Sequence, residues 1–213
     1  HDIASVTKPI TSTLIGMAIK QGKLKSPAQT MVDAYRNRSV GQMDVGKEKI
    51  LLEHLLTMSS GLACKSQGGE RGLWEMLGSG HDVQYMLNLG MEAPPGTRYV
   101  YCSGGMHLLS GLINEVTGKN SAEFARTSFF GPLGIRSFIW PEDPQGVSHG
   151  FGNLHLLPED MARIGQVFLQ NGTWKGKQII DPEWVKAATS SHIKTGGPGT
   201  SDYGYGWRIP QDG

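Results

Sequence analysis

The sequence has little cysteine, no basic cluster and no long apolar run, and each shortage excludes a class of protein. Its 213 residues contain two cysteines, Cys64 and Cys102, which are too few for a disulfide framework and lack metal-ligand spacing. They are either two buried thiols or one bridge in an exported protein. The sequence suggests no metal site, and no cofactor is expected.

The charge pattern and the apolar runs argue against two further classes, nucleic-acid-binding proteins and membrane-spanning proteins. The net charge is +1, and basic residues do not alternate with aromatic ones, which argues against a nucleic-acid partner. The longest apolar runs, such as residues 14–19 and 138–140, are far too short to span a membrane. No signal peptide is visible, but the chain begins almost on a helix, so this absence says little about the compartment.

The overall composition is that of a folded chain. Hydrophobic residues make up 38% and charged residues 18% of the sequence, which allows a core in one domain or two small ones. Thirty glycines and eleven prolines indicate many turns. Such a composition suits a site assembled from loops on a scaffold.

A serine and a lysine lie three residues apart at the start of the first predicted helix. Val6, Ile10 and Leu14 recur there at helical spacing. Because residues i and i+3 share a face of a helix, the Lys8 ammonium lies within reach of the Ser5 hydroxyl. The pattern is common, so by itself it does not separate a catalytic pair from a helix that happens to begin with serine.

Further helices are predicted from apolar periodicity and from proline, aspartate or glycine at their ends. They cover residues 50–58, 104–117, 120–130, 158–170 and 182–190. Residues 64–82 are glycine-rich and expected to be irregular, whereas residues 203–209 alternate as in a strand. The chain is therefore expected to be rich in helix and poor in strand.

A second motif, Tyr101-Cys102-Ser103, follows an extended stretch. Together with Ser5-x-x-Lys8, it resembles the serine β-lactamase and penicillin-binding-protein superfamily. The most similar branch is that of class C β-lactamases and their esterase and peptidase relatives, which carry Ser-x-x-Lys and then Tyr-x-Asn. Other segments resemble this branch in the same order: EHLLTMSSGL, PPGTRYVYCSGG, PLGI, DMARIGQVFLQNGTWKGKQIIDPEWV and YGYGW.

The resemblance implies a fold and a set of catalytic residues. The expected fold is α/β (α+β), serine β-lactamase-like, and this chain covers mainly the helical half plus the catalytic helix, with little of the antiparallel sheet. Ser5 would be the nucleophile, and Lys8 would hold or accept its proton. Tyr101 would be the partner base, its pKa lowered by nearby cations. The Ser5 amide would supply half of an oxyanion hole, and water would release the acyl group.

The same resemblance implies that residues 1–213 are the central part of a single β-lactamase-like catalytic unit. Flanking sheet strands are expected before residue 1 and after residue 213, together with the third motif and the second oxyanion donor. The isolated fragment is expected to be weak or inactive. The full-length protein is expected to be periplasmic or secreted, and its oligomeric state is not indicated.

One departure from the family pattern bears on the activity. Ser103 stands where the family has asparagine, and a hydroxyl can bond Lys8 but cannot offer both an amide donor and an acceptor to a substrate carbonyl. We expect a serine hydrolase that forms an acyl-enzyme on a small-molecule ester, amide or β-lactam, with esterase- or peptidase-like activity favoured over efficient β-lactam hydrolysis. The alternative is a penicillin-binding or sensor-type relative that acylates or binds without turnover.

Other residues receive peripheral or structural interpretations. His149 and Phe151 are expected to face the substrate, because the family's corresponding loop rims the pocket. His54 is interpreted as partly buried structure, and His107 as a structural residue or a substrate contact. Three tryptophans are interpreted as packing residues: Trp74, Trp140 and Trp184.

Two expectations follow from the order of segments in the family. Lys194-Thr195-Gly196 matches the family's third motif, but it precedes YGYGW instead of following it. It is therefore expected to be an exposed loop far from Ser5. The segments of Cys64 and Cys102 both border the pocket in the family, so the two cysteines are expected to lie close together, with a bridge possible.

Overall fold

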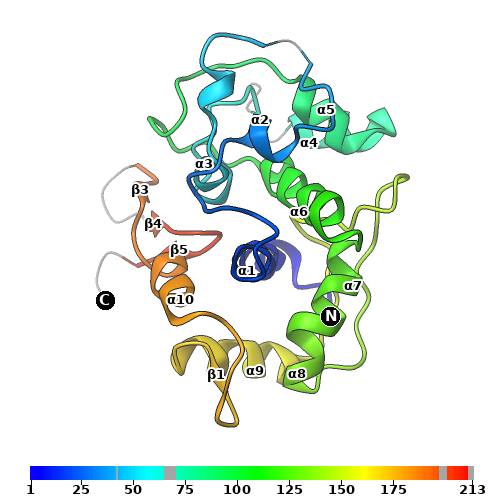
Figure 1. Ribbon diagram of the computed structural model, residues 1–213, viewed down its shortest axis with the longest axis vertical. Helices are drawn as coiled ribbons and strands as arrows, with labels where there is room; N and C mark the ends of the chain where they lie inside the picture. Colours follow the sequence, from blue (N-terminus) through cyan, green and yellow to red (C-terminus); the bar gives the residue numbers. More distant parts are fainter. Residues whose placement is uncertain (42, 65–70, 197–200, 211–213) are drawn as a thin grey trace.

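The computed structural model describes residues 1–41, 43–64, 71–196 and 201–210. One helix, α1 (Thr7–Lys20), lies at the centre, and Figure 1 shows it end-on with the other elements arranged around it. Among the described residues, we find no helix with the length and apolar character that a membrane crossing needs.

The other helices are mostly short. In chain order they are η1 (Ala4–Val6), α2 (Met31–Ala34), η2 (Lys47–Lys49), α3 (Leu52–Leu56), α4 (Arg71–Ser79), α5 (Asp82–Asn88), α6 (Ser103–Thr117), α7 (Ser121–Ala125), η3 (Arg126–Phe130), α8 (Gly131–Leu133), α9 (Pro158–Leu169) and α10 (Pro182–Ala188). Two small antiparallel sheets accompany them: β1 (Thr173–Trp174) with β2 (Lys177–Gln178), and β3 (Ile193–Lys194), β4 (Asp202–Tyr203) and β5 (Arg208–Ile209) in that order. The helix-rich fold with little strand is as expected from the sequence.

Helix α1 is buried on every side from Thr7 to Ala18. Thr7, Thr11 and Thr13 each donate a side-chain hydrogen bond of 2.7–2.8 Å to a backbone carbonyl. A buried hydroxyl that is bonded in this way avoids the cost of an unpaired polar group. The helix ends before Gly22, whose φ of +69° is accessible to glycine at little cost. The predicted first helix is thus confirmed as the central element of the fold.

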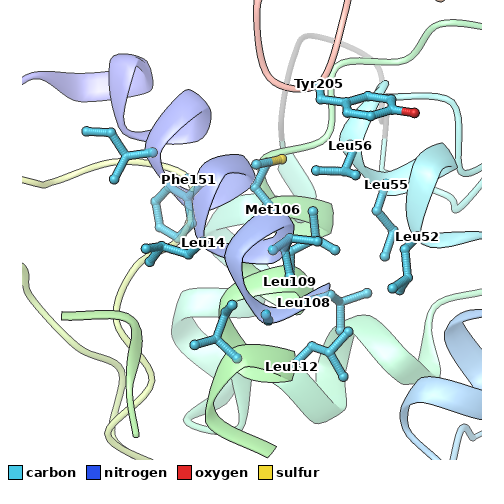
Figure 2. Packing of buried hydrophobic residues seen from close by; sticks show 14 of the residues in the cluster. Leu14, Leu52, Leu55, Leu56, Met106, Leu108, Leu109, Leu112, Phe151 and Tyr205 are labelled. Carbon is cyan, nitrogen blue, oxygen red and sulfur yellow. The ribbon is translucent and has the colours of Figure 1, made fainter. Parts of the chain in front are cut away.

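A core of leucines joins α1 to its neighbours (Figure 2). Eight side chains, each at most 2% exposed, meet between α1, α3 and α6: Leu14, Leu52, Leu55, Leu56, Met106, Leu108, Leu109 and Leu112. Burying one such side chain contributes about 1.5–3 kcal/mol. This core holds α1 and α6 together. It therefore fixes Ser5 and Lys8, at the start of α1, relative to Tyr101, which precedes α6.

Two predictions of secondary structure are wrong. Residues 71–79 form α4 instead of irregular chain, and residues 65–70 of the same predicted segment lie outside the described residues. Residues 203–209 are not one strand, because β4 and β5 form a hairpin in which Tyr203 pairs with Arg208. Gly206, with φ +81°, lies in the turn, and a Cβ there would be 3.0 Å from the Lys8 backbone. The hairpin therefore packs closely on α1.

The tryptophans divide into two groups. Trp140 and Trp184 are 5% and 8% exposed, which confirms them as packing residues. A Cβ at Gly16 would lie 2.4 Å from the Trp184 ring, so glycine lets α10 approach α1 at this point. Trp74 is 74% exposed, and its interpretation as a packing residue is wrong. It lies on the solvent side of α4, whose buried side is marked by Met76.

The two cysteines form a disulfide, which decides between the two alternatives left open by the sequence. Cys64 and Cys102 have Cα atoms 5.5 Å apart and are separated by 38 residues in the chain. The bond holds the residue that follows Tyr101 against the segment before α4.

Closing a chain loop of this length should stabilise the folded state by about 4 kcal/mol, because it restricts the unfolded chain. We therefore expect the double variant Cys64→Ala, Cys102→Ala of the full protein to unfold roughly 10 °C lower in thermal scans. Dithiothreitol should lower the melting temperature of the parent protein and leave that of the variant unchanged. Equal melting temperatures for parent and variant would contradict the prediction.

Candidate active site

Ser5 lies in η1, immediately before α1, and its side chain is exposed. The preceding Ala4 has a φ of +45°, in the left-handed region that non-glycine residues rarely adopt. The Asp2 carboxylate accepts a 2.8 Å hydrogen bond from the Ala4 amide, and the Ile3 amide donates to Leu154 O at 2.9 Å. These bonds hold the strained turn that presents Ser5 at the end of the central helix.

Lys8 lies three residues after Ser5, in the first turn of α1. Its side chain is 1% exposed. The ammonium donates to Ser5 Oγ at 2.9 Å and to the backbone carbonyl of Phe151 at 2.8 Å. A lysine held by two acceptors in a buried position has little freedom to turn away from the serine.

Tyr101 completes the group from the segment before α6. Its hydroxyl donates to Ser5 Oγ at 2.8 Å, and the Lys8 ammonium lies 4.7 Å from the centre of the tyrosine ring. The structure thus brings Ser5, Lys8 and Tyr101 together, although Tyr101 is far from the other two in the sequence.

A cavity of about 310 Å³ opens beside Ser5. Its lining comes from η1, α1, the Tyr101 segment and the β4–β5 hairpin: Ser5, Val6, Pro9, Tyr101, Tyr203, Gly206, Trp207 and Arg208. The Trp207 ring packs on Phe168 at 4.7 Å between centroids, and Tyr203 packs on Tyr99 at 5.4 Å. A smaller apolar hollow of about 90 Å³ adjoins it and shares Val6, Pro9 and Trp207.

A larger cavity, of about 390 Å³, is lined by α2 and neighbouring segments and contains none of the three residues. We assign function to the smaller one, because it contains the serine with its two hydrogen-bond partners. Volume alone does not indicate chemistry, whereas a nucleophile beside candidate bases does.

The other predicted site residues lie in different places. Ser103, which was expected to contact substrate, begins α6, is 3% exposed and is absent from the cavity lining. Neither His149 nor Phe151 lines the cavity beside Ser5. The Phe151 ring is 6% exposed and stacks on His149 at 5.2 Å between centroids, so the ring belongs to the core and does not face a substrate as expected. Burial, together with nearby His107, lowers the pKa of His149.

Phe151 contributes to the site in a way that the sequence could not indicate. Its backbone carbonyl, and not its ring, accepts the hydrogen bond from Lys8. A backbone contact leaves no signal in residue type. Tyr203 and Trp207 also line the cavity. The sequence indicates that the YGYGW segment containing them resembles the family, but it does not indicate that their rings face the cavity.

The remaining histidines and the third-motif candidate can also be placed. His54 is half-buried in α3 and its Nδ1 accepts from the Leu51 amide, which confirms a structural role. His107 is fully buried in α6. Lys194 is exposed, as expected, but it lies on strand β3 and not in a loop. It is absent from the cavity lining.

The arrangement supplies the parts that nucleophilic catalysis at a carbonyl requires. A serine hydroxyl is a weak nucleophile and needs a partner that takes its proton. Here two side chains with exchangeable protons, Lys8 and Tyr101, lie within hydrogen-bond distance of Ser5 Oγ, which is also the range in which proton transfer operates. One side of Ser5 faces a cavity large enough for a small molecule.

Comparisons with known proteins show the family to which the chain belongs. The Beta-lactamase family model matches residues 1–213. The 6-aminohexanoate-dimer hydrolase of Paenarthrobacter ureafaciens is 24% identical over 200 residues, which cover 88% of this chain and 50% of that protein. Penicillin-binding protein 4 of Amycolatopsis lactamdurans is 28% identical over 202 residues, which cover 90% of this chain and 50% of that protein.

A solved structure extends the likeness to three dimensions. EstCE1, a hydrolase with promiscuous acyltransferase activity, has a TM-score of 0.77 at 17% identity, over 98% of this chain and 68% of that chain. At this identity the likeness shows the fold. The chain spans about half the length of the two curated relatives. With the family model matching from the first residue to the last, the chain belongs to the Beta-lactamase family.

Proposed function

We propose that the full protein is a serine hydrolase that works through an acyl-enzyme on Ser5. One observation carries the proposal: Ser5 Oγ lies 2.9 Å from Lys8 Nζ and 2.8 Å from Tyr101 Oη. The names of two similar proteins, a dimer hydrolase and a penicillin-binding protein, support chemistry at a carbonyl. The Tyr-x-Ser variant of the second motif supports a place among the class C-related branch.

In the proposed acylation step, Ser5 Oγ bonds to the substrate carbonyl carbon as its proton passes to Tyr101. This step requires Tyr101 as a phenolate that accepts from Ser5, whereas the hydroxyl in the structure donates to Ser5 Oγ. The Lys8 ammonium, 4.7 Å from the centre of the ring, is the cation beside this base. Tyr101 then returns the proton to the departing alcohol or amine as its bond to the carbonyl carbon breaks. Water attacks the acyl-enzyme in the second half, gives its proton to the same base, and releases Ser5.

The cavity favours a substrate with an apolar acyl or leaving group. Val6, Tyr203 and Trp207 offer hydrocarbon surface beside the nucleophile, and the adjoining hollow extends that surface. Ser103 stands where the family has an asparagine, and it is buried and absent from the cavity lining, so no amide at this position faces a substrate carbonyl. We therefore favour esters or simple amides over efficient β-lactam hydrolysis.

The disulfide bears on where the full protein works. Such bonds persist in oxidising compartments and are rare in the cytosol. The Cys64–Cys102 bond therefore supports a periplasmic or secreted location for the full protein.

The proposal is tested by acylating the full protein with a p-nitrophenyl ester and, separately, with a fluorescent penicillin. We expect one acyl group per chain, located on Ser5 by peptide mapping, and none on the Ser5→Ala variant. Release of the ester-derived acyl group with continuing turnover supports a hydrolase. A stable adduct without turnover supports the alternative, a penicillin-binding or sensor-type relative. Labelling that survives Ser5→Ala would falsify the assignment of the nucleophile.

A further inference from the structure

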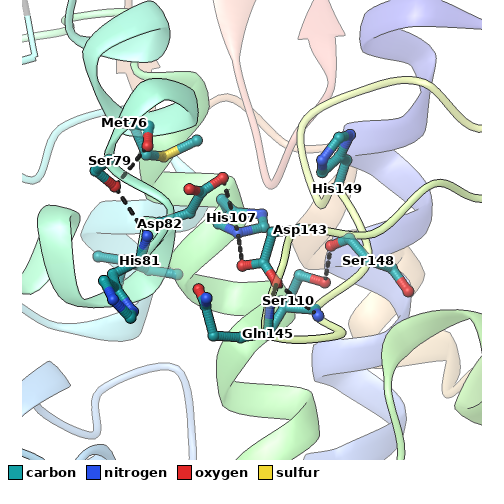
Figure 3. A network of polar contacts seen from close by, with 12 residues as sticks. Met76, Ser79, His81, Asp82, His107, Ser110, Asp143, Gln145, Ser148 and His149 are labelled. Atoms are coloured by element: carbon teal, nitrogen blue, oxygen red, sulfur yellow. Dashed lines mark hydrogen bonds and ion pairs between the residues drawn. The ribbon is translucent and has the colours of Figure 1, made fainter.

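A second group of reactive side chains lies buried outside the cavity beside Ser5 (Figure 3). Asp82 begins α5, His107 lies in α6, and Asp143 lies in the loop before α9. Their exposed fractions are 1%, 0% and 6%. One donor atom from each residue falls within 4.8 Å of the others, and we call these three residues the buried triad.

The two carboxylates of the triad differ in how they are satisfied. Asp143 Oδ2 lies 3.0 Å from His107 Nε2, and Oδ1 accepts from the amides of Gln145 and Val147. Both oxygens of Asp143 therefore have hydrogen-bond partners.

Asp82 is not satisfied in this way. Neither of its carboxylate oxygens accepts a hydrogen bond from any residue that the structure describes, and both are buried. The carboxylate points toward His107, with Oδ2 4.0 Å from Nε2, as Figure 3 shows. A buried carboxylate without a donor is costly, because nothing replaces the water it has lost. His107, which Asp82 faces, is already bonded to Asp143, so a cation among the three groups would balance the second carboxylate.

We propose that the buried triad is a binding site for one divalent transition-metal ion of the Zn²⁺, Mn²⁺ or Co²⁺ kind. Two carboxylate oxygens and one imidazole nitrogen form a donor set that suits such ions, whereas Mg²⁺ and Ca²⁺ prefer oxygen alone. A divalent ion would also balance the negative charge of two carboxylates.

The geometry permits coordination with small movements. With metal–ligand bonds of about 2.0–2.2 Å, the ligand atoms of a tetrahedral site lie about 3.3–3.6 Å apart. The separations from His107 Nε2 to Asp143 Oδ2 and to Asp82 Oδ2 are 3.0 Å and 4.0 Å, each within about 0.7 Å of these values. Coordination requires the proton of the neutral imidazole to reside on Nδ1. The amides of Gln145 and Val147 donate to Asp143 Oδ1 and would hold the Asp143 carboxylate in the orientation for coordination. Hydrogen bonds to the ligands of a metal commonly have this role.

The site would stabilise the loop that holds Lys8. The Phe151 ring packs edge-on against the His107 ring at 5.8 Å between centroids, and the Phe151 carbonyl accepts from Lys8. The loop from Asp143 to Phe151 is thus fastened to the triad at one end and to the lysine at the other. The ion's role here is structural, and the proposal does not depend on the proposed function.

The test is metal binding by the full protein after removal of metals with a chelator. Titration with Zn²⁺ in a calorimeter should give one equivalent bound per chain, and the melting temperature should rise by a few degrees with saturating metal. Co²⁺ should give visible absorption bands that Zn²⁺ abolishes. The Asp82→Asn variant should bind at least roughly 100-fold more weakly. The control Glu142→Gln removes an exposed carboxylate of the same loop and should bind like the parent.

Two outcomes would overturn the proposal. The first is no saturable binding of either ion to the parent protein. A higher melting temperature for Asp82→Asn would then show Asp82 to be an unpaired buried carboxyl group. The second is binding that Asp82→Asn leaves unchanged. If Asp82→Asn does not fold, His107→Gln is measured in its place, and unchanged binding there overturns the proposal equally.

Discussion

Replacing Tyr101 by phenylalanine should lower the rate of Ser5 acylation in the full protein by roughly 10²–10⁴-fold, the usual contribution of a positioned proton acceptor. The change removes one oxygen atom, which lies 2.8 Å from Ser5 Oγ. The ring remains, and with it the contact to the Lys8 ammonium. The measurement is the pre-steady-state rate of acyl-enzyme formation with a p-nitrophenyl ester, alongside the melting temperature.

Tyr205→Phe is the matched control for this experiment. Tyr205 lies in the β4–β5 hairpin next to the cavity, and its hydroxyl donates to Glu53 at 3.0 Å, but it does not line the cavity. The Tyr205→Phe variant should lose this hydrogen bond, worth about 1 kcal/mol of stability, and acylate Ser5 as fast as the parent protein. If Tyr101→Phe acylates as fast as the parent, the tyrosine is structural and another group takes the proton from Ser5.

Helices that begin with proline, aspartate or glutamate were predictable from the sequence. Helix α4, which lies in a glycine-rich segment, was not. The helix from Pro158 has a proline and two acids in its first turn, and Asp181 accepts from the Glu183 amide as an N-cap should. Helix α4 was missed because its glycine-rich surroundings hide a short apolar stripe. The strand signal at residues 203–209 was real, but Gly206 divides it into a hairpin that packs on α1.

The proposed site was predictable where it depends on side chains at fixed spacing. Ser5 and Lys8 meet because they are one helical turn apart, and the Tyr-x-Ser segment was recognised by its resemblance to a family. The Phe151 carbonyl was not predictable, since a backbone acceptor leaves no mark in the sequence. The buried triad was missed for a related reason, because its three residues lie on three separate elements and no spacing relates them.

Lys8 differs from Tyr101 in that its proposed catalytic role is combined with almost complete burial. The residue is 1% exposed, and its ammonium donates to Ser5 Oγ and to the Phe151 carbonyl. Lys8→Met keeps the length and the apolar stem of the side chain but removes the charge and these hydrogen bonds. A buried charge costs free energy that its partners repay only in part, so we expect stability to change by no more than about 2 kcal/mol.

Acylation, in contrast, should fall by three or more orders of magnitude in Lys8→Met, on the order of 10³–10⁴-fold for the proton-handling step. Without the cation, Ser5 loses a donor that holds its oxygen, and Tyr101 loses the positive charge beside its ring. Ester turnover and the yield of Ser5 adduct, measured at equal concentrations of folded protein, distinguish this loss from a loss of folding.

Lys47→Met is the matched control for the lysine, because the chain offers a second buried lysine with the same kind of partners. Lys47 is 0% exposed, and its ammonium donates to the carbonyls of Leu87 and Leu89 at 2.6 Å and 2.8 Å. Burial lowers its pKa, as expected for an ammonium removed from water. Lys47→Met should disturb stability as much as Lys8→Met and leave the acylation rate of the folded protein unchanged. Equal acylation rates in the two variants would mean that Lys8 is a structural lysine like Lys47, and that the proton of Ser5 is handled by Tyr101 alone.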